Sequence, residues 1–403
     1  MTGLHRSDVA RRAGSHPDEC YHHTPTGTAL WRDGDPPGDR IFHAIGDLTL
    51  ESGDHLPDVV LAYETRGELN PARDNAILVE HALTGDSHVV GPTGPGHPTA
   101  GWWPDLVGPG ALLDTDEHFV VAVNVLGGCR GSTGPGALAA DGRPRGSRFP
   151  RVTIRDRVAA EARLADALEI DQWHTVVGGS MGGMRTLEWV ASFPDRVRTA
   201  VALASSGYAT AEQIARSRAQ ILAIQNDPWF AGGDYYDNAH GPEVGLGIAR
   251  RIAHVTYRSE LELHERFGRD AQDEAPGDSG RPRYTIESYP DHHGSKLAGR
   301  FDANSYIVLS EAMNSHDIGR GRGGLSAAPA PFAGRLVLVP VDSDRLYPPR
   351  LSREVAQAHP GSELATISSI VGHDGFLTET DRVAALLREV VSGAGAHDTT
   401  STE

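Results

Sequence analysis

A serine lies among glycines in the segment GGSMG at residues 178–182, which has the spacing G-x-S-x-G. The run WHTVV comes before it, as in a buried strand, and a helical pattern follows it. A nucleophile on such a turn needs neighbours without bulky side chains, and the N-terminus of the next helix faces the negative charge that develops during attack. The spacing therefore predicts Ser180 as a nucleophile. The structural alternative is a glycine-rich turn that carries an incidental serine.

A nucleophilic serine needs a base, and the base needs a carboxylate to orient it. In α/β-hydrolases these groups follow in the order serine, aspartate, histidine, each after a later strand. Asp342 and Asp344 follow the run LVLVPV, and His373 follows LATISSI. His373 is thus the predicted base, and on position alone either aspartate could orient it. A second oxyanion donor is expected after the early strand AILVE, in HALTG at residues 81–85, where a plain turn would fit as well.

The elements that must position these residues alternate along the chain. Strand patterns in DVVLAYETRG, NAILVEHAL, HFVVAVNVL, WHTVVGG and VRTAVALASS are interleaved with helical patterns, which indicates a parallel α/β sheet. The pattern then becomes mostly helical, and strands return at GRLVLVPV and LATISSIVG. The sequence therefore predicts an α/β-hydrolase sheet formed by residues 41–206 and 331–393, with a helical lid insertion at 207–330. Residues 1–40 are expected to be a mobile tail, and residues 394–403 a disordered one.

Composition limits the partners. The formal net charge of −17 over 403 residues argues against nucleic acid or an anionic membrane as the main partner. No apolar run is long enough to span a membrane as a helix. Two cysteines are too few for a disulfide framework, so we expect a reducing, cytoplasmic location. His292 and His293 lack a spaced third ligand, and we expect no metal site.

Several blocks of the sequence together resemble the homoserine O-acetyltransferase family. In chain order they are HALTGDSHVVGPTGPGHPTAGWW, NVLGGCRGSTGP, GSRFPRVTIRD, GGSMGGM, AHVTYRSE, NSHDIGRGRGG, SDRLYPPR and GHDGFL, within about residues 41–390. The resemblance implies that Ser180 takes the acetyl group from acetyl-CoA and that His373 is the general base. It also implies that Asp344, rather than Asp342, is the third member of the triad. The oxyanion hole would be the backbone N–H groups of Leu83 and Met181.

The resemblance also implies an acceptor site made of Arg250, Asp374 and Tyr257. A guanidinium can hold the carboxylate of L-homoserine and a carboxylate can hold its ammonium, which leaves the hydroxyl to be deprotonated. We therefore expect a double displacement that makes O-acetyl-L-homoserine for methionine biosynthesis. Acetyl-CoA would be a co-substrate and no cofactor would be permanently bound. The family commonly forms homodimers through the lid helices.

Other hypotheses stay open at this point. The same scaffold could use succinyl-CoA as donor, or another acceptor such as serine or a deacetylated antibiotic. A serine esterase would release acetate to water and should lack a carboxylate-binding arginine in the lid, and a non-catalytic binding protein usually lacks a triad member. Because the phosphates of coenzyme A are anionic, local arginines must offset the negative net charge. The candidates are Arg320, Arg322 and Arg345.

Overall fold

The computed structural model describes residues 28–272 and 283–392. The predicted C-terminal tail lies outside these ranges, as do the first 27 residues of the predicted N-terminal tail. Residues 28–40, which composition assigned to the same tail, instead pack on the body of the molecule. The Thr28 hydroxyl donates to the carboxylate of Asp302 at 2.8 Å, and the Trp31 ring stacks on Phe42 with centroids 4.7 Å apart.

A central sheet of eight strands organises the chain, in the order β1-β2-β6-β3-β7-β8-β9-β10. The strands of this sheet are β1 Ile41–Thr49, β2 His55–Arg66, β3 Ala76–Glu80, β6 Phe119–Val123, β7 Trp173–Gly179, β8 Val197–Leu203, β9 Arg335–Val339 and β10 Glu363–Leu364. Strands β4 Val107–Gly108 and β5 Leu113–Asp114 pair separately. The predicted parallel arrangement is present from β6 to β10, and the sheet is antiparallel at its other edge. There β1 pairs with β2 in antiparallel fashion, because the short turn between them allows no crossover. Strand β2 is also antiparallel to β6.

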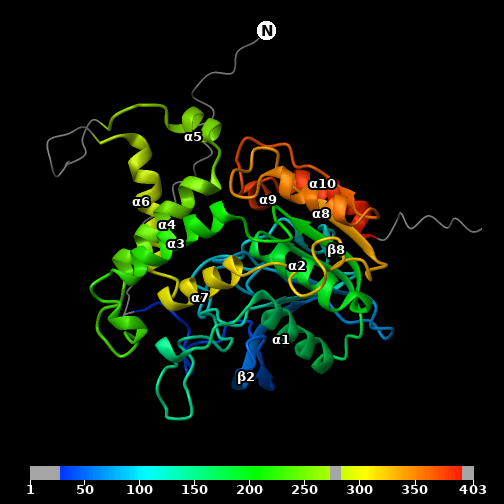
Figure 1. Cartoon of the computed structure of the whole chain (residues 1–403), viewed down its shortest axis with the longest axis horizontal. Coiled ribbons are helices and arrows are strands. Elements are labelled where there is room, and N and C mark those ends of the chain that lie inside the picture. Colours follow the sequence, from blue (N-terminus) through cyan, green and yellow to red (C-terminus); the bar gives the residue numbers. More distant parts are fainter. Residues whose placement is uncertain (1–27, 273–282, 393–403) are drawn as a thin grey trace, which may run out of the picture.

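Helices cover both faces of the sheet (Figure 1). The helices are α1 Ile154–Ala167, α2 Met181–Ser192, α3 Ala211–Gln225, α4 Glu243–Tyr257, α5 Glu260–Phe267, α6 Thr285–Ala298, α7 Ala303–Asn314, α8 Pro349–Ala358, α9 Gly375–Thr378 and α10 Thr380–Val391. Successive residues of a strand point to opposite faces. Accordingly, Val176 of β7 packs in the core that contains residues of α1, α2 and α8, and Val177 in the core that contains residues of α10.

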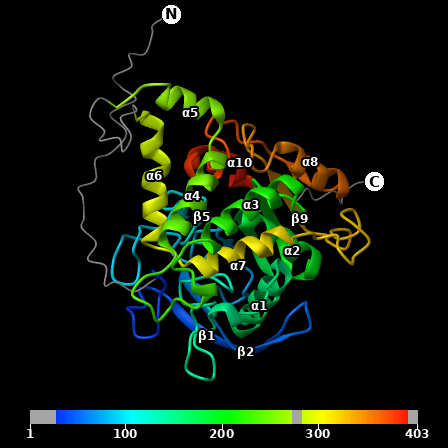
Figure 2. The ribbon, with the colours of Figure 1, turned by 60° about the vertical axis from the view of Figure 1, so that its left-hand side comes forward.

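The helices α3 to α7 come between β8 and β9 along the chain, and α3, α4 and α6 lie side by side, in the order α3-α4-α6 (Figures 1 and 2). Within this insertion α4 ends at Tyr257 and α5 begins at Glu260, because Ser259 caps α5 by accepting the N–H of Glu262. Helix α6 forms although Pro290 and Gly294 lie within it. Among the described residues, no helix has the length and apolarity to cross a membrane.

The last predicted strand, LATISSIVG, is mostly not a strand. Only Glu363 and Leu364 form β10, and Ile367 adds a single bridge to Val341. Beyond it, Ser368 and Ser369 hydrogen-bond to the carboxylate of Asp342 at 2.8 and 3.0 Å instead of extending a strand ladder. The chain therefore turns early and carries His373 over the carboxyl end of the sheet.

Candidate active site

Ser180 lies at the joint of β7 and α2, where the sequence predicts it. Its backbone has φ 58° and ψ −119°, and residues other than glycine rarely adopt a positive φ. The glycines around it permit close packing. A Cβ at Gly179 would lie 2.2 Å from the Phe376 ring, and one at Gly182 would lie 2.0 Å from the carbonyl oxygen of Glu80. The elbow needs small neighbours because other backbone and rings press on both sides of it.

The Ser180 hydroxyl meets the predicted base. Its Oγ lies 2.9 Å from Nε2 of His373, and Nδ1 of His373 lies 2.7 Å from Oδ2 of Asp344. The other carboxylate oxygen, Oδ1 of Asp344, accepts the N–H groups of Leu346 and Tyr347 at 2.7 and 2.8 Å. All three side chains of this hydrogen-bonded row are buried. Such a row can move a proton from the serine to the imidazole while the carboxylate holds the ring in place.

The alternative carboxylate, Asp342, is used elsewhere. Its oxygens accept hydrogen bonds from Ser368 and from the N–H of Ser369. Asp344 is therefore the aspartate that the fold brings to His373.

The pKa of His373 is raised by the carboxylates around it. Burial by itself would lower its pKa, but the charge and hydrogen bond of Asp344, together with the charge of Asp374, raise it above the ordinary histidine value. Two aromatic rings also fix the imidazole. The Tyr347 ring stacks on it at 5.1 Å between centroids, and Phe376 meets it edge-on at 5.6 Å. Sequence reasoning did not single out Tyr347, although it lies in the block SDRLYPPR.

The two predicted oxyanion donors follow neighbouring parallel strands, Leu83 after β3 and Met181 after β7. Met181 is the first residue of α2, and Leu83 follows β3 in the loop that Gly85 closes by donating its N–H to the carbonyl of Ala82 at 2.9 Å. Within the described part of the chain, no protein acceptor takes the N–H of either residue. Two free amides beside a nucleophile can stabilise a negatively charged oxygen.

The predicted acceptor residues converge on the same place from the insertion. Arg250 and Tyr257 are seven residues apart on α4, and the guanidinium carbon lies 5.2 Å from the centre of the Tyr257 ring. The Tyr257 ring lies 5.8 Å from the His373 ring, and Arg250 donates to the Thr84 hydroxyl at 3.4 Å. The Tyr257 ring therefore lies between the predicted base, His373, and the guanidinium of Arg250.

Asp374 is present at this site but is already paired. Nε of Arg258 lies 3.2 Å from its Oδ2, and its backbone N–H donates to the carbonyl of Tyr257 at 3.2 Å. Arg258 is thus a residue of the site that the sequence analysis missed, although it stands directly after Tyr257 in the block AHVTYRSE. A ligand ammonium would share the Asp374 carboxylate with this guanidinium.

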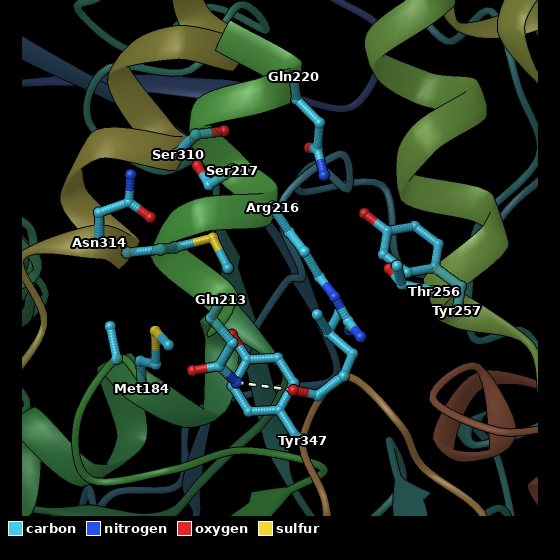
Figure 3. A pocket seen from close by; sticks show the side chains of 13 residues that line it. Met184, Gln213, Arg216, Ser217, Gln220, Thr256, Tyr257, Ser310, Asn314 and Tyr347 are labelled. Carbon is cyan, nitrogen blue, oxygen red and sulfur yellow. Dashed lines mark hydrogen bonds between the residues drawn. The ribbon is translucent and has the colours of Figure 1, made fainter. Parts of the chain in front are cut away.

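A pocket opens beside the base, between α3, α4 and α7. Figure 3 shows Gln213, Arg216, Ser217 and Gln220 along one wall, with Tyr257 and Tyr347 at other sides. Both tyrosines contact the His373 ring, so the pocket reaches the side of the triad. Its lining residues are Met184, Ala209, Gln213, Arg216, Ser217, Gln220, Thr256, Tyr257, Ser310, Met313, Asn314, Leu346 and Tyr347.

Two of the arginines considered for coenzyme A are committed to ion pairs. Arg322 lies 2.6 Å from the buried carboxylate of Glu188, and Arg320 lies 3.0 Å from Glu51. Arg345 is exposed. The basic residue that lines the pocket is instead Arg216.

One group of described side chains has the spacing of a metal site, namely Glu64, His88 and His97. The atoms that could bind a metal already form hydrogen bonds or an ion pair within the protein. Nδ1 of His88 is hydrogen-bonded to Glu64 at 3.1 Å, and Nε2 of His97 accepts the N–H of Asp39 at 3.0 Å. Arg66 also lies 3.4 Å from the Glu64 carboxylate. We propose no metal ion there.

The chain is similar to known proteins over most of its length. Residues 75–380 match the family model described as alpha/beta hydrolase fold. The homoserine O-acetyltransferase of Thermobifida fusca is 56% identical over 369 residues, which cover 91% of this chain and 97% of the relative. The homoserine O-acetyltransferase of Nocardia farcinica is 54% identical, with 90% and 95% covered.

Solved structures with the same fold bear different names. The crystal structure of homoserine O-acetyltransferase from Bacillus anthracis has a TM-score of 0.79 at 25% identity, over 90% of this chain and 99% of that one. The crystal structure of esterase E22 has a TM-score of 0.80 at 26% identity, over 87% and 99%. The fold is therefore compatible with acyl transfer to an alcohol and with ester hydrolysis.

Proposed function

This chain belongs to the homoserine O-acetyltransferase family of α/β-hydrolases, and we propose that Ser180 carries an acetyl group from acetyl-CoA to the hydroxyl of L-homoserine. The product is O-acetyl-L-homoserine, an intermediate of methionine biosynthesis. The observation that carries the proposal is the hydrogen-bonded row Ser180–His373–Asp344, at 2.9 and 2.7 Å, beside a cation on the insertion, Arg250.

In the first half-reaction, His373 takes the proton of the Ser180 hydroxyl as the oxygen attacks the thioester carbonyl. The carbonyl oxygen becomes negative and is held by the N–H groups of Leu83 and Met181. The intermediate collapses, the C–S bond breaks, and the thiol of coenzyme A leaves with the proton that His373 returns. Acetyl-Ser180 stays behind, and each step uses only groups of this chain, so no permanently bound cofactor is required.

In the second half-reaction, the hydroxyl of L-homoserine replaces the thiol. Arg250 binds its carboxylate, and Asp374, which Arg258 holds in place, binds its ammonium. His373 removes the hydroxyl proton and the oxygen attacks the acetyl carbonyl, again with the negative charge on the amides of Leu83 and Met181. Collapse frees Ser180, which recovers its proton from His373.

The acceptor must react before water does. Orientation by charged groups at both ends of homoserine brings the hydroxyl to the acyl carbon, and the insertion helices limit the entry of water. In this proposal α3 to α7 act as the lid. An esterase on the same fold has no need for a carboxylate-binding arginine on the insertion, and the presence of Arg250 favours the transferase.

The pocket between α3 and α7 fits the arm of the acyl donor. Amide and hydroxyl side chains line it, and the Oγ atoms of Ser217 and Ser310 are buried without a hydrogen-bond partner. The amide groups of the pantetheine arm can occupy such donors and acceptors, and Arg216 can meet a phosphate. Succinyl-CoA as donor, and serine or a deacetylated antibiotic as acceptor, use the same mechanism and are the alternatives. The cytoplasmic location stays a prediction.

The first experiment is thiol release from acetyl-CoA by the purified protein, with and without L-homoserine. We expect sustained release only with homoserine, and none in Ser180→Ala. Ser352→Ala, which removes another buried hydroxyl, is the matched control and should retain activity. Steady release without an acceptor would identify an esterase instead, and release from succinyl-CoA alone would change the donor.

A further inference from the structure

Two arginines of the insertion meet at one residue of the oxyanion loop. Arg250, on α4, donates to the hydroxyl of Thr84 at 3.4 Å. Arg300, between α6 and α7, donates to the carbonyl oxygen of the same residue at 3.0 Å. Thr84 directly follows Leu83, whose N–H is a proposed oxyanion donor. Both guanidinium groups therefore lie next to the reacting centre.

Neither of these two cations has an acidic partner within ion-pair distance in the described part of the chain. The contrast with their neighbours is clear. Arg251, the next residue of α4, lies 2.8 Å from Asp291, and Arg258, at the end of the same helix, lies 3.2 Å from Asp374. Arg250 and Arg300 are partly buried and face each other's charge instead. The charge of Asp86 acts on Arg300 from beyond ion-pair distance and offsets this repulsion only in part. Two partly buried like charges without a directly paired anion favour a ligand that supplies one.

The positive charge of these two arginines acts on the titratable groups around them. Burial, and then the charge of Arg250, lower the pKa of Arg300 to about 10, so it still carries its proton at neutral pH. Burial, and then the charge of Arg250, also lower the pKa of His293 to about 3. The pKa of Lys296 is lowered by burial and then by Arg300 and Arg250. In a chain with a net charge of −17, this is a local region of positive potential.

We propose that Arg300 and Arg250 together bind the carboxylate of the acceptor, and that Arg300 thereby restricts the reaction to acceptors with a free carboxylate. The inference rests on the proposed function and adds to it a residue that determines specificity. Two guanidinium groups can each donate to a carboxylate oxygen, and the bound anion neutralises the like charges. An acceptor that lacks the carboxylate, such as the amide or an ester of homoserine, leaves both cations unpaired and is rejected.

Arg300 has a competing structural role, because its bond to the Thr84 carbonyl could simply hold the oxyanion loop. The two roles affect different half-reactions. In a double displacement, kcat/KM for acetyl-CoA reports only the acylation of Ser180, which needs the oxyanion hole. By contrast, kcat/KM for homoserine reports only the second half, in which the acceptor binds.

The test measures both constants in Arg300→Met, Arg300→Lys and the matched control Arg251→Met, which removes an arginine that already has an acidic partner. In Arg300→Met we expect kcat/KM for L-homoserine to fall about 10- to 100-fold, the effect of losing one charged hydrogen bond, with kcat/KM for acetyl-CoA nearly unchanged. For the wild type, kcat/KM for L-homoserinamide should be much lower than kcat/KM for homoserine. In Arg300→Met, kcat/KM for the amide should fall far less than kcat/KM for homoserine. Arg300→Lys keeps the charge, and its kcat/KM for L-homoserine should lie between those of the wild type and Arg300→Met. Arg251→Met should have both constants near the wild-type values.

The proposal is overturned if Arg300→Met keeps the wild-type kcat/KM for homoserine. It is also overturned if kcat/KM falls by the same factor for acetyl-CoA and for homoserine, as a displaced oxyanion loop would cause. It is also overturned if the preference for homoserine over its amide is unchanged. If Arg300→Met does not fold, Arg300→Lys decides by the same ratios. Failure of the proposed function has a different signature, since the wild-type enzyme itself would then show no homoserine-dependent thiol release.

Discussion

At the scale of single residues, the active site is held in states that are unfavourable in isolation. Ser180 has a positive φ, which for a residue other than glycine costs on the order of 1–3 kcal/mol. The strand offsets it, since the Ser180 N–H donates to the carbonyl of Leu203 at 2.9 Å. His373 is buried yet has a raised pKa, because the carboxylate of Asp344 outweighs the loss of solvation. The same carboxylate thus makes the base stronger and orients it.

This raised pKa predicts the pH dependence of acylation. Protonated His373 cannot accept the serine proton, so kcat/KM for acetyl-CoA should fall as the pH drops through the raised pKa, with a midpoint above the ordinary histidine value of about 6.5. In Asp344→Asn only the charge of Asp374 is left to oppose burial, so the midpoint should move to lower pH and the plateau should drop by roughly 10⁴-fold. The pH profile of initial thiol release measures both effects.

Asp342→Asn is the control for this experiment. Asp342 is exposed and bonds to Ser368 and Ser369, and the substitution should leave the midpoint in place. A shifted midpoint in Asp342→Asn, with a wild-type profile in Asp344→Asn, would contradict the assignment of the triad.

At the scale of elements, the site depends on how closely α2 approaches the end of β3. Arg185 of α2 lies 2.6 Å from Glu80 of β3 and 2.7 Å from Glu161 of α1, and it donates to the carbonyl of His81 at 3.0 Å. This buried group of charged side chains ties the helix that follows Ser180 to the strand that leads to Leu83, the proposed oxyanion donor. Gly182 lets the two backbones touch.

The close approach predicts the effect of Gly182→Ala. The added Cβ would lie 2.0 Å from the carbonyl oxygen of Glu80, so the first turn of α2 must move away from β3. We expect the free energy of unfolding to fall by about 1–3 kcal/mol, and kcat/KM for acetyl-CoA to fall further than stability alone explains, because the Met181 N–H moves with the turn. Urea unfolding and initial rates below the transition measure these changes.

Gly94→Ala serves as the matched substitution. A Cβ there meets nothing within 4 Å, and both stability and rate should stay near the wild type. Equal effects of the two substitutions, or a fully active Gly182→Ala, would show that the contact between α2 and β3 does not set the oxyanion geometry.

At the scale of the whole molecule, the insertion both completes the site and presents an apolar surface. On α4, Val244, Ile248 and Val255 share one face and are 68%, 43% and 55% exposed. The opposite side of the helix carries Arg250 and Tyr257 to the active site. We propose that the apolar face is the contact of a homodimer, because a second copy would cover it symmetrically.

The dimer predicts a mass difference in solution. The wild-type protein should have the mass of two chains by light scattering coupled to size exclusion, and the double variant Ile248→Asp/Val255→Asp should have the mass of one. Leu364→Asp, an equally exposed apolar position on β10, should stay dimeric. A monomeric wild type, or dissociation by Leu364→Asp as well, would refute this contact.

Where the signal is local, the sequence alone is enough to predict which positions carry the chemistry. The elbow at Ser180 is encoded by glycine spacing between a strand and a helix, and both patterns depend on residues close in the chain. The order of serine, aspartate and histidine along the chain follows from the succession of strands. The resemblance to the family then separated Asp344 from Asp342, which spacing alone did not.

Contacts between side chains that are far apart in the chain could not be predicted in this way and are visible only in the packed fold. Thr84 and Arg300 are 216 residues apart in the chain, and no periodic pattern relates them. The pairing of Arg258 with Asp374, the antiparallel edge at β1 and β2, and the packing of residues 28–40 are likewise contacts between segments far apart. Local patterns report backbone conformation and burial, whereas an ion pair, or the absence of one, depends on where the packed fold places each charge.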